Sequence, residues 1–258
     1  MIRQWQFRDG IAVTQIVLFT AFLAIGILFY FQLKNGWFSI TLFSAIRLVG
    51  ASCMLATLRT DSRGVWATVF VSESLGMVLL TFLLLNLLKR ANGFTKVLSS
   101  WHFRVPELIC WAGIGISIAD FVSASRKANA LSPGSLTRAS VGLFVALYGW
   151  AVLLFLLTCR QWACIPPLER RGVMGFAAAI PFMSVRTCYT VIFAATGDAR
   201  FSAVEGNPVI YLSMSTLMET AILTVVAWSI YSMPAQPQNA ATEDSYQLVA
   251  SLHESRGS

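Results

Sequence analysis

The sequence is poor in charged residues. They make up only 12% of its 258 residues, against 56% that are hydrophobic, and the mean hydropathy is +0.67. A soluble globular domain carries about 25% charged residues, roughly twice this share. We therefore predict a polytopic membrane protein rather than a soluble domain.

Histidine is nearly absent, and the five cysteines show no paired spacing. His102 lies in a predicted loop and His253 in the C-terminal tail, which argues against a His-rich metal centre or a Ser-His-Asp triad inside the membrane. The cysteines are typical of small apolar packing residues. Aspartate-rich magnesium–diphosphate motifs and Gly-rich phosphate loops are also missing. We expect no metal and no cofactor.

Long apolar runs dominate instead. A bilayer is crossed by about 20 apolar residues at a rise of about 1.5 Å each. The runs that meet this test are residues 11–33, 38–58, 65–88, 105–125, 141–162, 172–195 and 208–232. The predicted fold class is all-α, with residues 1–232 forming a bundle of seven transmembrane helices. Residues 233–258 are polar and are predicted to be a disordered tail.

The net charge of +7 lies mainly in short loops, so we expect contact with lipid head groups and not with nucleic acid. Lysines and arginines outside the runs divide eight to nine between the two faces, which leaves the orientation open. We predict a multi-pass protein of the endoplasmic reticulum or another endomembrane. Its expected partners are the bilayer and a lipophilic small-molecule substrate.

Five ionisable residues interrupt the apolar runs. Arg47 and Glu73 lie far from the ends of the second and third runs, and Arg186 and Glu219 lie within the sixth and seventh. Counted from the face that holds the N-terminus, these four lie roughly 12 to 16 Å deep, and Asp120 of the fourth run roughly 8 Å. A charge at this depth costs several kcal/mol unless it is paired or hydrated, so we expect the five to meet.

Two interpretations of this cluster stay open. In one, two arginines and three acids form a buried ion-pair network that only fixes helix packing. In the other, the groups line a cavity open to the N-terminal face. Two cations cannot neutralise three acids, so one acid stays protonated and can donate its proton. Asp120 is the first candidate for a catalytic acid, Glu73 the second, and Glu219 completes the set.

Aromatic side chains share helix faces with these charges. Phe70 lies three residues before Glu73, Trp66 lies seven before it, and Tyr189 lies three after Arg186. An aromatic face attracts a cation and can shelter a developing carbocation. The alternative is that these rings simply pack, as most aromatic residues do.

Two further patterns concern the last run. The segment 207–211 (NPVIY) matches the NPxxY motif of seven-helix receptors, but it opens a helix here and closes one there, so we treat the match as coincidence. Arg47 and Glu73 are matched by Arg186 and Glu219 four helices later, which hints at a parallel repeat of the kind that some transporters show.

Three segments carry a family resemblance. They are 44–57 (SAIRLVGASCMLAT), 180–189 (IPFMSVRTCY) and 207–224 (NPVIYLSMSTLMETAILT). Through them the chain resembles an uncharacterised family of fungal seven-helix integral membrane proteins, over most of residues 10–232. The resemblance implies a fungal source and a seven-helix fold. In its intramembrane acids the chain is also similar to fungal metal-free terpene cyclases of meroterpenoid pathways, though not in sequence motifs.

The leading functional hypothesis is a membrane enzyme of secondary metabolism, a metal-free, acid-initiated cyclase or isomerase acting on a prenylated lipophilic substrate. Asp120 or Glu73 would donate the proton, and Arg47 and Arg186 would hold the remaining acids ionised. The alternatives are a small-solute transporter or receptor that uses the same charge cluster, and a structural membrane protein.

Overall fold

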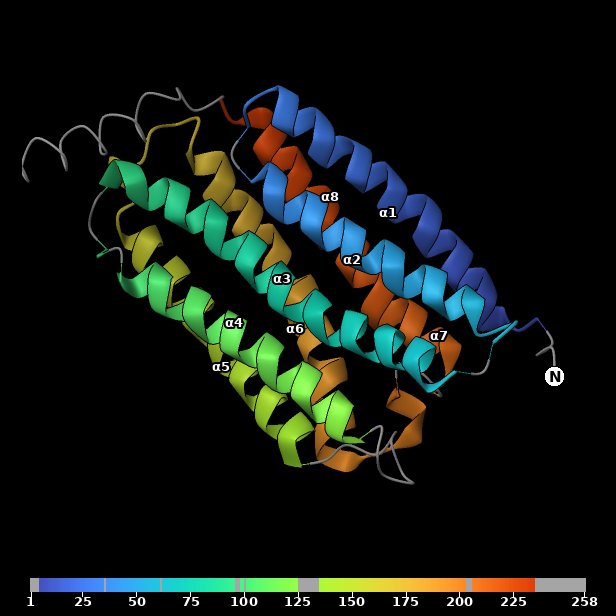
Figure 1. Ribbon diagram of the computed structural model, residues 1–258. Helices are drawn as coiled ribbons and strands as arrows, with labels where there is room; N and C mark the ends of the chain where they lie inside the picture. Colours follow the sequence, from blue (N-terminus) through green and yellow to red (C-terminus); the bar gives the residue numbers. More distant parts are fainter. Residues whose placement is uncertain are drawn as a thin grey trace, which may run out of the picture.

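The computed structural model describes residues 5–34, 36–60, 62–95, 98–99, 101–124, 135–202 and 206–234. In this part of the chain long helices run side by side in one bundle (Figure 1), without a strand. A lipid environment offers no hydrogen-bond partner to backbone groups, and a helix satisfies them within its own segment. The predicted all-α bundle is confirmed.

The described residues form seven helical rods, the last of them interrupted. The rods are α1 (Phe7–Phe31), α2 (Trp37–Ala56), α3 (Arg63–Thr95), α4 (Trp101–Ala124), α5 (Ser135–Arg160), α6 (Arg170–Thr196), and finally α7 (Pro208–Tyr211), the π-helical segment η3 (Leu212–Thr216) and α8 (Leu217–Ser232) in succession. Within the described ranges, six rods, all but α4, are long and apolar enough to cross a membrane. The chain is therefore a multi-pass membrane protein.

Several helix boundaries differ from the predicted ones: α1 begins at Phe7 and not at residue 11, and α5 begins at Ser135 and not at residue 141. The third helix was predicted to end at residue 88, but α3 continues to Thr95, and the fourth was predicted to begin at residue 105, but α4 begins at Trp101. The apolar run of α3 ends at Lys89 and Arg90. The helix continues beyond them, because these cations are paired with Glu107 and Glu169. Of the predicted tail, residues 235–258 lie outside the described residues.

The central helix of the bundle is α3. Of its most apolar stretch 67% is buried, against 33% for α1 and for α5. In Figure 1 it runs between α2 and α4, with α6 behind it. Four of its leucines, Leu80, Leu83, Leu84 and Leu88, are fully buried in the main apolar core. Glu73, which also lies on α3, is buried in the interior of the bundle.

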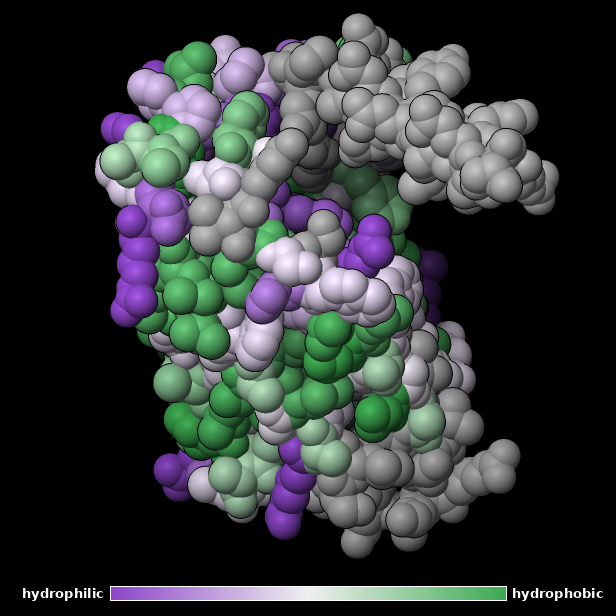
Figure 2. All heavy atoms as spheres, turned by 90° about the vertical axis from the view of Figure 1, so that its left-hand side faces the viewer, coloured by the Kyte–Doolittle hydropathy of each residue, from purple (hydrophilic) through white to green (hydrophobic). Residues whose placement is uncertain are grey.

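Large apolar side chains also cover the outside of the bundle. Phe31 and Trp228 are more than 70% exposed, which suits contact with lipid chains. On the face shown in Figure 2, hydrophobic residues spread across the middle and hydrophilic residues lie mostly above and below. This surface agrees with a membrane environment.

Helices α1 and α2 approach each other closely at a glycine. A Cβ atom on Gly26 would lie 2.4 Å from Oγ1 of Thr41 and 3.1 Å from its backbone nitrogen. The lack of a side chain at this position therefore sets the distance between the two helices. Gly10, in the same helix, has no atom within 4 Å of its own added Cβ.

We predict that Gly26→Ala destabilises the protein by about 1–3 kcal/mol, because the new methyl group forces α1 and α2 apart. Gly10→Ala serves as the matched control and should leave stability unchanged or raise it slightly, since alanine favours a helix by about 1 kcal/mol over glycine. Thermal unfolding of the purified variants in detergent measures both. Equal unfolding temperatures for the two variants would contradict the close approach.

Candidate functional site

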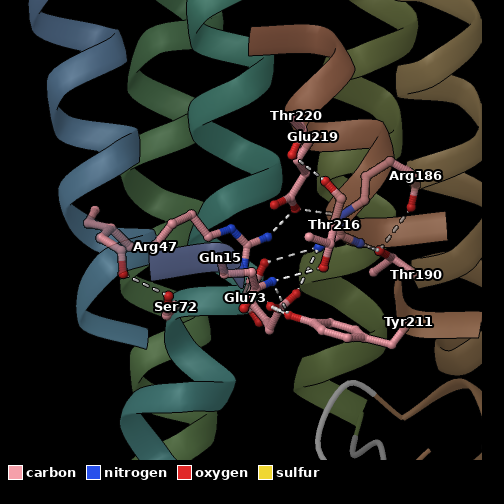
Figure 3. A network of polar contacts seen from close by, with 12 residues as sticks. Gln15, Arg47, Ser72, Glu73, Arg186, Thr190, Tyr211, Thr216, Glu219 and Thr220 are labelled. Carbon is pink, nitrogen blue, oxygen red and sulfur yellow. Dashed lines mark hydrogen bonds and ion pairs between the residues drawn. The ribbon is translucent and has the colours of Figure 1, made fainter. Parts of the chain in front are cut away.

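Four charged side chains meet inside the bundle. Arg47 comes from α2, Glu73 from α3, Arg186 from α6 and Glu219 from α8, and Figure 3 shows them pointing toward one another. None is more than 8% exposed. We call these four residues the charge ring. Its two cations and two anions balance, as buried charges must.

Each arginine of the ring contacts both glutamates. Arg47 donates through Nη1 to Oε1 of Glu73 at 2.5 Å and through Nη2 to Oε1 of Glu219. Arg186 donates through Nε to Oε1 of Glu219 at 2.8 Å and through Nη2 to Oε2 of Glu73 at 3.2 Å. The ring therefore joins α2 and α3 to α6 and α8 by crossed ion pairs.

Uncharged donors complete the ring. The hydroxyl of Tyr211 donates to Oε1 of Glu73, and Gln15 of α1 donates to that hydroxyl at 3.0 Å and to Oγ1 of Thr216 at 2.9 Å. Arg186 donates through Nη1 to Oγ1 of Thr190, one turn further along α6, at 2.7 Å. Every described rod except α4 and α5 thus supplies a side chain to this network.

Small residues on α2 and α3 let the ring form. A Cβ atom on Gly76 would lie 2.6 Å from Nη2 of Arg47, so the guanidinium rests directly on the α3 backbone. One turn away, a Cβ on Gly50 would lie 2.2 Å from Oγ of Ser72, whose hydroxyl donates to the Ile46 carbonyl at 3.0 Å. Close contact between α2 and α3 brings Arg47 within reach of Glu73.

The last rod is irregular where it meets the ring. Asn207 caps α7 by accepting a hydrogen bond from the Val209 amide at 2.9 Å, and Pro208 occupies the first helical position, where a missing N–H costs nothing. The rod then changes to π-helical geometry over residues 212–216. Such segments are rare and are frequent at functional sites.

A small pocket adjoins the ring. Its volume is about 20 Å³, and its walls include Arg47, Glu73, Tyr211 and Gln15. A single water needs about 10–15 Å³ by the same measure, so the pocket has room for one water molecule. Arg8 lines the same pocket and donates to the Gly206 carbonyl at 2.7 Å, close to the start of α1. The pocket thus extends from the ring toward the N-terminal face.

Two atoms of the ring have unused hydrogen-bonding capacity. Nε of Arg47 and Oε2 of Glu219 are buried and have no hydrogen-bond partner within the described residues. A buried donor or acceptor without a partner costs about 1–3 kcal/mol, and such groups mark places where a water or ligand binds. The ring can therefore take one further acceptor at Arg47 and one further donor at Glu219.

The structure brings together four of the five predicted charges, Arg47, Glu73, Arg186 and Glu219. Asp120 lies in α4, and its side chain falls outside what the structure describes. Among the described residues, no group of three His, Cys, Asp or Glu side chains is placed to hold a metal ion.

The three predicted aromatic residues divide between two neighbourhoods. The ring of Tyr189 is buried, with the guanidinium carbon of Arg186 5.7 Å from its centroid. Trp66 and Phe70 pack instead in a small apolar cluster around Met54, nearer the start of α3. Tyr189 thus lies against an arginine of the ring.

Sequence reasoning missed the polar partners of the ring. Tyr211 lies in the NPVIY segment that was set aside as coincidence, although it precedes Glu219 by eight residues, about two helical turns. Gln15 is the one amide in an otherwise apolar stretch of α1. Each is a polar residue within the first turns of an apolar run, a weaker form of the signal that identified the arginines.

We predict that Glu219→Gln destabilises the protein by about 3–5 kcal/mol, because it leaves two buried arginines with one carboxylate. Lys89→Gln removes the ion pair to Glu107, in which the lysine side chain is 52% exposed, and should cost less than about 1 kcal/mol. Denaturation of both variants in detergent measures the difference. Similar losses would show that the ring is not tightly coupled to folding.

We also predict that Gly76→Ala displaces the Arg47 guanidinium and lowers stability by about 1–3 kcal/mol. Gly93→Ala, in the same helix, has no atom within 4 Å of the new methyl group and should be neutral or slightly stabilising. Thermal unfolding of the two variants tests the contact. An unchanged Gly76→Ala protein would mean that Arg47 can leave α3 without cost.

Comparison with known proteins identifies a family but no activity. No curated protein and no solved structure matches the chain. One family model, described as a domain of unknown function (DUF7702), matches residues 5–233. That range contains all the described helices and the whole charge ring. The chain belongs to the DUF7702 family.

Proposed function

We propose that the protein is a membrane transporter for a small solute that carries a carboxylate, and that the charge ring is its binding site in a closed form. The observation that carries the proposal is the set of crossed ion pairs, buried near the middle of the spans, beside a pocket that leads toward one face. Transporters commonly bind their substrates near the membrane midplane, between helices that are interrupted there.

The ring is suited to exchange of partners. Each arginine contacts two carboxylates, so a solute carboxylate can replace one of them while the other keeps the arginine paired. Nε of Arg47 already has no partner within the described residues, and Arg47 lines the pocket. A carboxylate that enters through the pocket therefore finds an unused donor before any existing ion pair breaks.

The interrupted last rod supports a moving element at the same place. The π-helical segment lies between Tyr211, which donates to Glu73, and Glu219, which accepts from both arginines. A change of helical geometry here would move both partners of the ring together. The present pocket of about 20 Å³ admits only water, so solute entry requires such a rearrangement.

The cyclase hypothesis has less support from this geometry. Glu73 and Glu219 each accept hydrogen bonds from both arginines of the ring, so both carboxylates are engaged in ion pairs. A site for a drug-sized ligand measures about 300–1,000 Å³, far more than the pocket of about 20 Å³ beside the ring. The cyclase with Asp120 as its acid stays a prediction, as do the fungal source, a role in secondary metabolism and a location in the endoplasmic reticulum or another endomembrane.

The test is uptake of labelled mono- and dicarboxylates and amino acids into vesicles that contain the purified protein. We expect at least one solute to enter faster than into protein-free vesicles. Arg47→Lys should lower that uptake about tenfold or more, because lysine keeps the charge but loses the forked geometry that binds two carboxylates. Ser213→Ala, an exposed residue in the same π-helical segment, is the control and should leave uptake unchanged.

Two results would overturn the proposal. One is a panel in which no solute enters faster than into empty vesicles. The other is a solute whose uptake is the same in the wild type and in Arg47→Lys. If Arg47→Lys lowers only the unfolding temperature, the ring serves helix packing alone.

A further inference from the structure

A second cavity lies at the opposite end of the bundle from the N-terminal face. It is a groove of about 410 Å³ between the first turn of α2, the last turns of α3 and the end of α8. This volume is within the range of about 300–1,000 Å³ typical of small-molecule sites. Because these helix ends belong to the predicted spans, the groove opens where a membrane meets water.

The walls of the groove change in character along α3. Phe82, Leu83 and Leu87 line its deeper part, and Asn86, Lys89 and Arg90 line it toward the helix end. Trp37 and Phe38, at the start of α2, add aromatic faces to the apolar side. Apolar walls at membrane depth with basic groups at the interface match a lipid, with its acyl chain below and its head group above.

Arg90 is built into this groove with one donor unused. It is only 6% exposed, and Nε and Nη2 each donate to Glu169 at 2.7 Å, while Nη2 also donates to the Pro234 carbonyl at 2.7 Å. Nη1 is buried and has no hydrogen-bond partner within the described residues. A buried guanidinium N–H without an acceptor calls for a ligand oxygen.

The charges around the groove also favour an anion. Near the groove there are three cations, Lys34, Lys89 and Arg90, and two acids, Glu107 and Glu169. Lys34 donates to the carbonyls of Tyr231 and Met233, and Met233 is part of the groove wall. The difference of one positive charge complements a lipid head group with a net negative charge better than a zwitterionic one.

We propose that this groove binds an anionic glycerophospholipid. Its phosphate lies against Arg90 and Lys89, and one acyl chain lies over Phe82, Leu83 and Leu87. Free phosphate alone would leave the apolar part of the groove unfilled, so the site takes the phosphate as part of a lipid. This site is separate from the charge ring and does not depend on the transport proposal.

The experiment measures lipid retained by the full-length protein after purification in detergent. Phosphatidylserine and phosphatidylcholine with identical acyl chains are added in turn, and the bound lipid is counted by native mass spectrometry. We expect phosphatidylserine to bind about tenfold more tightly, the scale expected for two basic side chains near a membrane surface. Inorganic phosphate at millimolar concentration should not compete with it.

Two variants locate the site. Gly93 lines the groove, and its added Cβ has no atom within 4 Å, so Gly93→Phe places an aromatic ring at the groove wall and should abolish the preference for phosphatidylserine. Gly149→Phe, at an exposed glycine of α5 that also has open space, is the matched control and should keep it. Lys89→Gln should lower the preference severalfold while leaving the fold intact.

Three outcomes would overturn the proposal. They are equal binding of the two lipids, an unchanged preference in Gly93→Phe, and displacement of the lipid by inorganic phosphate. The last would identify the site as one for a free anion. Unfolding temperatures of all three variants exclude loss of the fold as the cause of a change.

Discussion

The balance of charge within the ring is the constraint on which the rest of the bundle depends. In hydrocarbon, a charged group must find its partner inside the protein, and each pair limits where its helices can lie. Two arginines and two glutamates from four helices satisfy one another only in one relative placement of α2, α3, α6 and α8. Apolar packing supplies most of the contact area, but it tolerates sliding far better than the ion pairs do.

The small residues near the ring follow from the same constraint. A guanidinium that contacts carboxylates on two other helices needs room, and Gly76 supplies it on the face of α3. The close approach of Gly50 to Ser72 then brings α2 near enough for the arginine to cross. Charge placement and backbone spacing are thus coupled, because neither the ion pairs nor the helix contact could form without the other.

Counting depth along the predicted spans brought Arg47, Glu73, Arg186 and Glu219 to one level, and the structure places them in contact. Depth is accessible from sequence because the rise per residue is fixed. The crossed pairing is not, since it depends on the rotation of each helix about its axis. The same limit explains why Trp66 and Phe70, predicted to share a face with Glu73, lie in a neighbouring cluster. The end of α3 was predicted too early, at residue 88, because hydropathy indicates where a segment leaves the membrane and not where its helix ends.

The two ends of the last rod are held by different kinds of contact. At its C-terminal end, Lys34, Arg171 and Arg90 donate to the backbone carbonyls of residues 231–234 and anchor α8. Toward its start, the rod contains the π-helical segment and contacts the ring through side chains alone. These backbone anchors at one end, and the bond from Arg8 to the Gly206 carbonyl before the other, leave the π-helical segment between them as the place where the rod can change geometry at least cost. In the rearrangement that we propose for transport, Tyr211 and Thr216 therefore move first, and the end of α8 stays where its basic neighbours hold it.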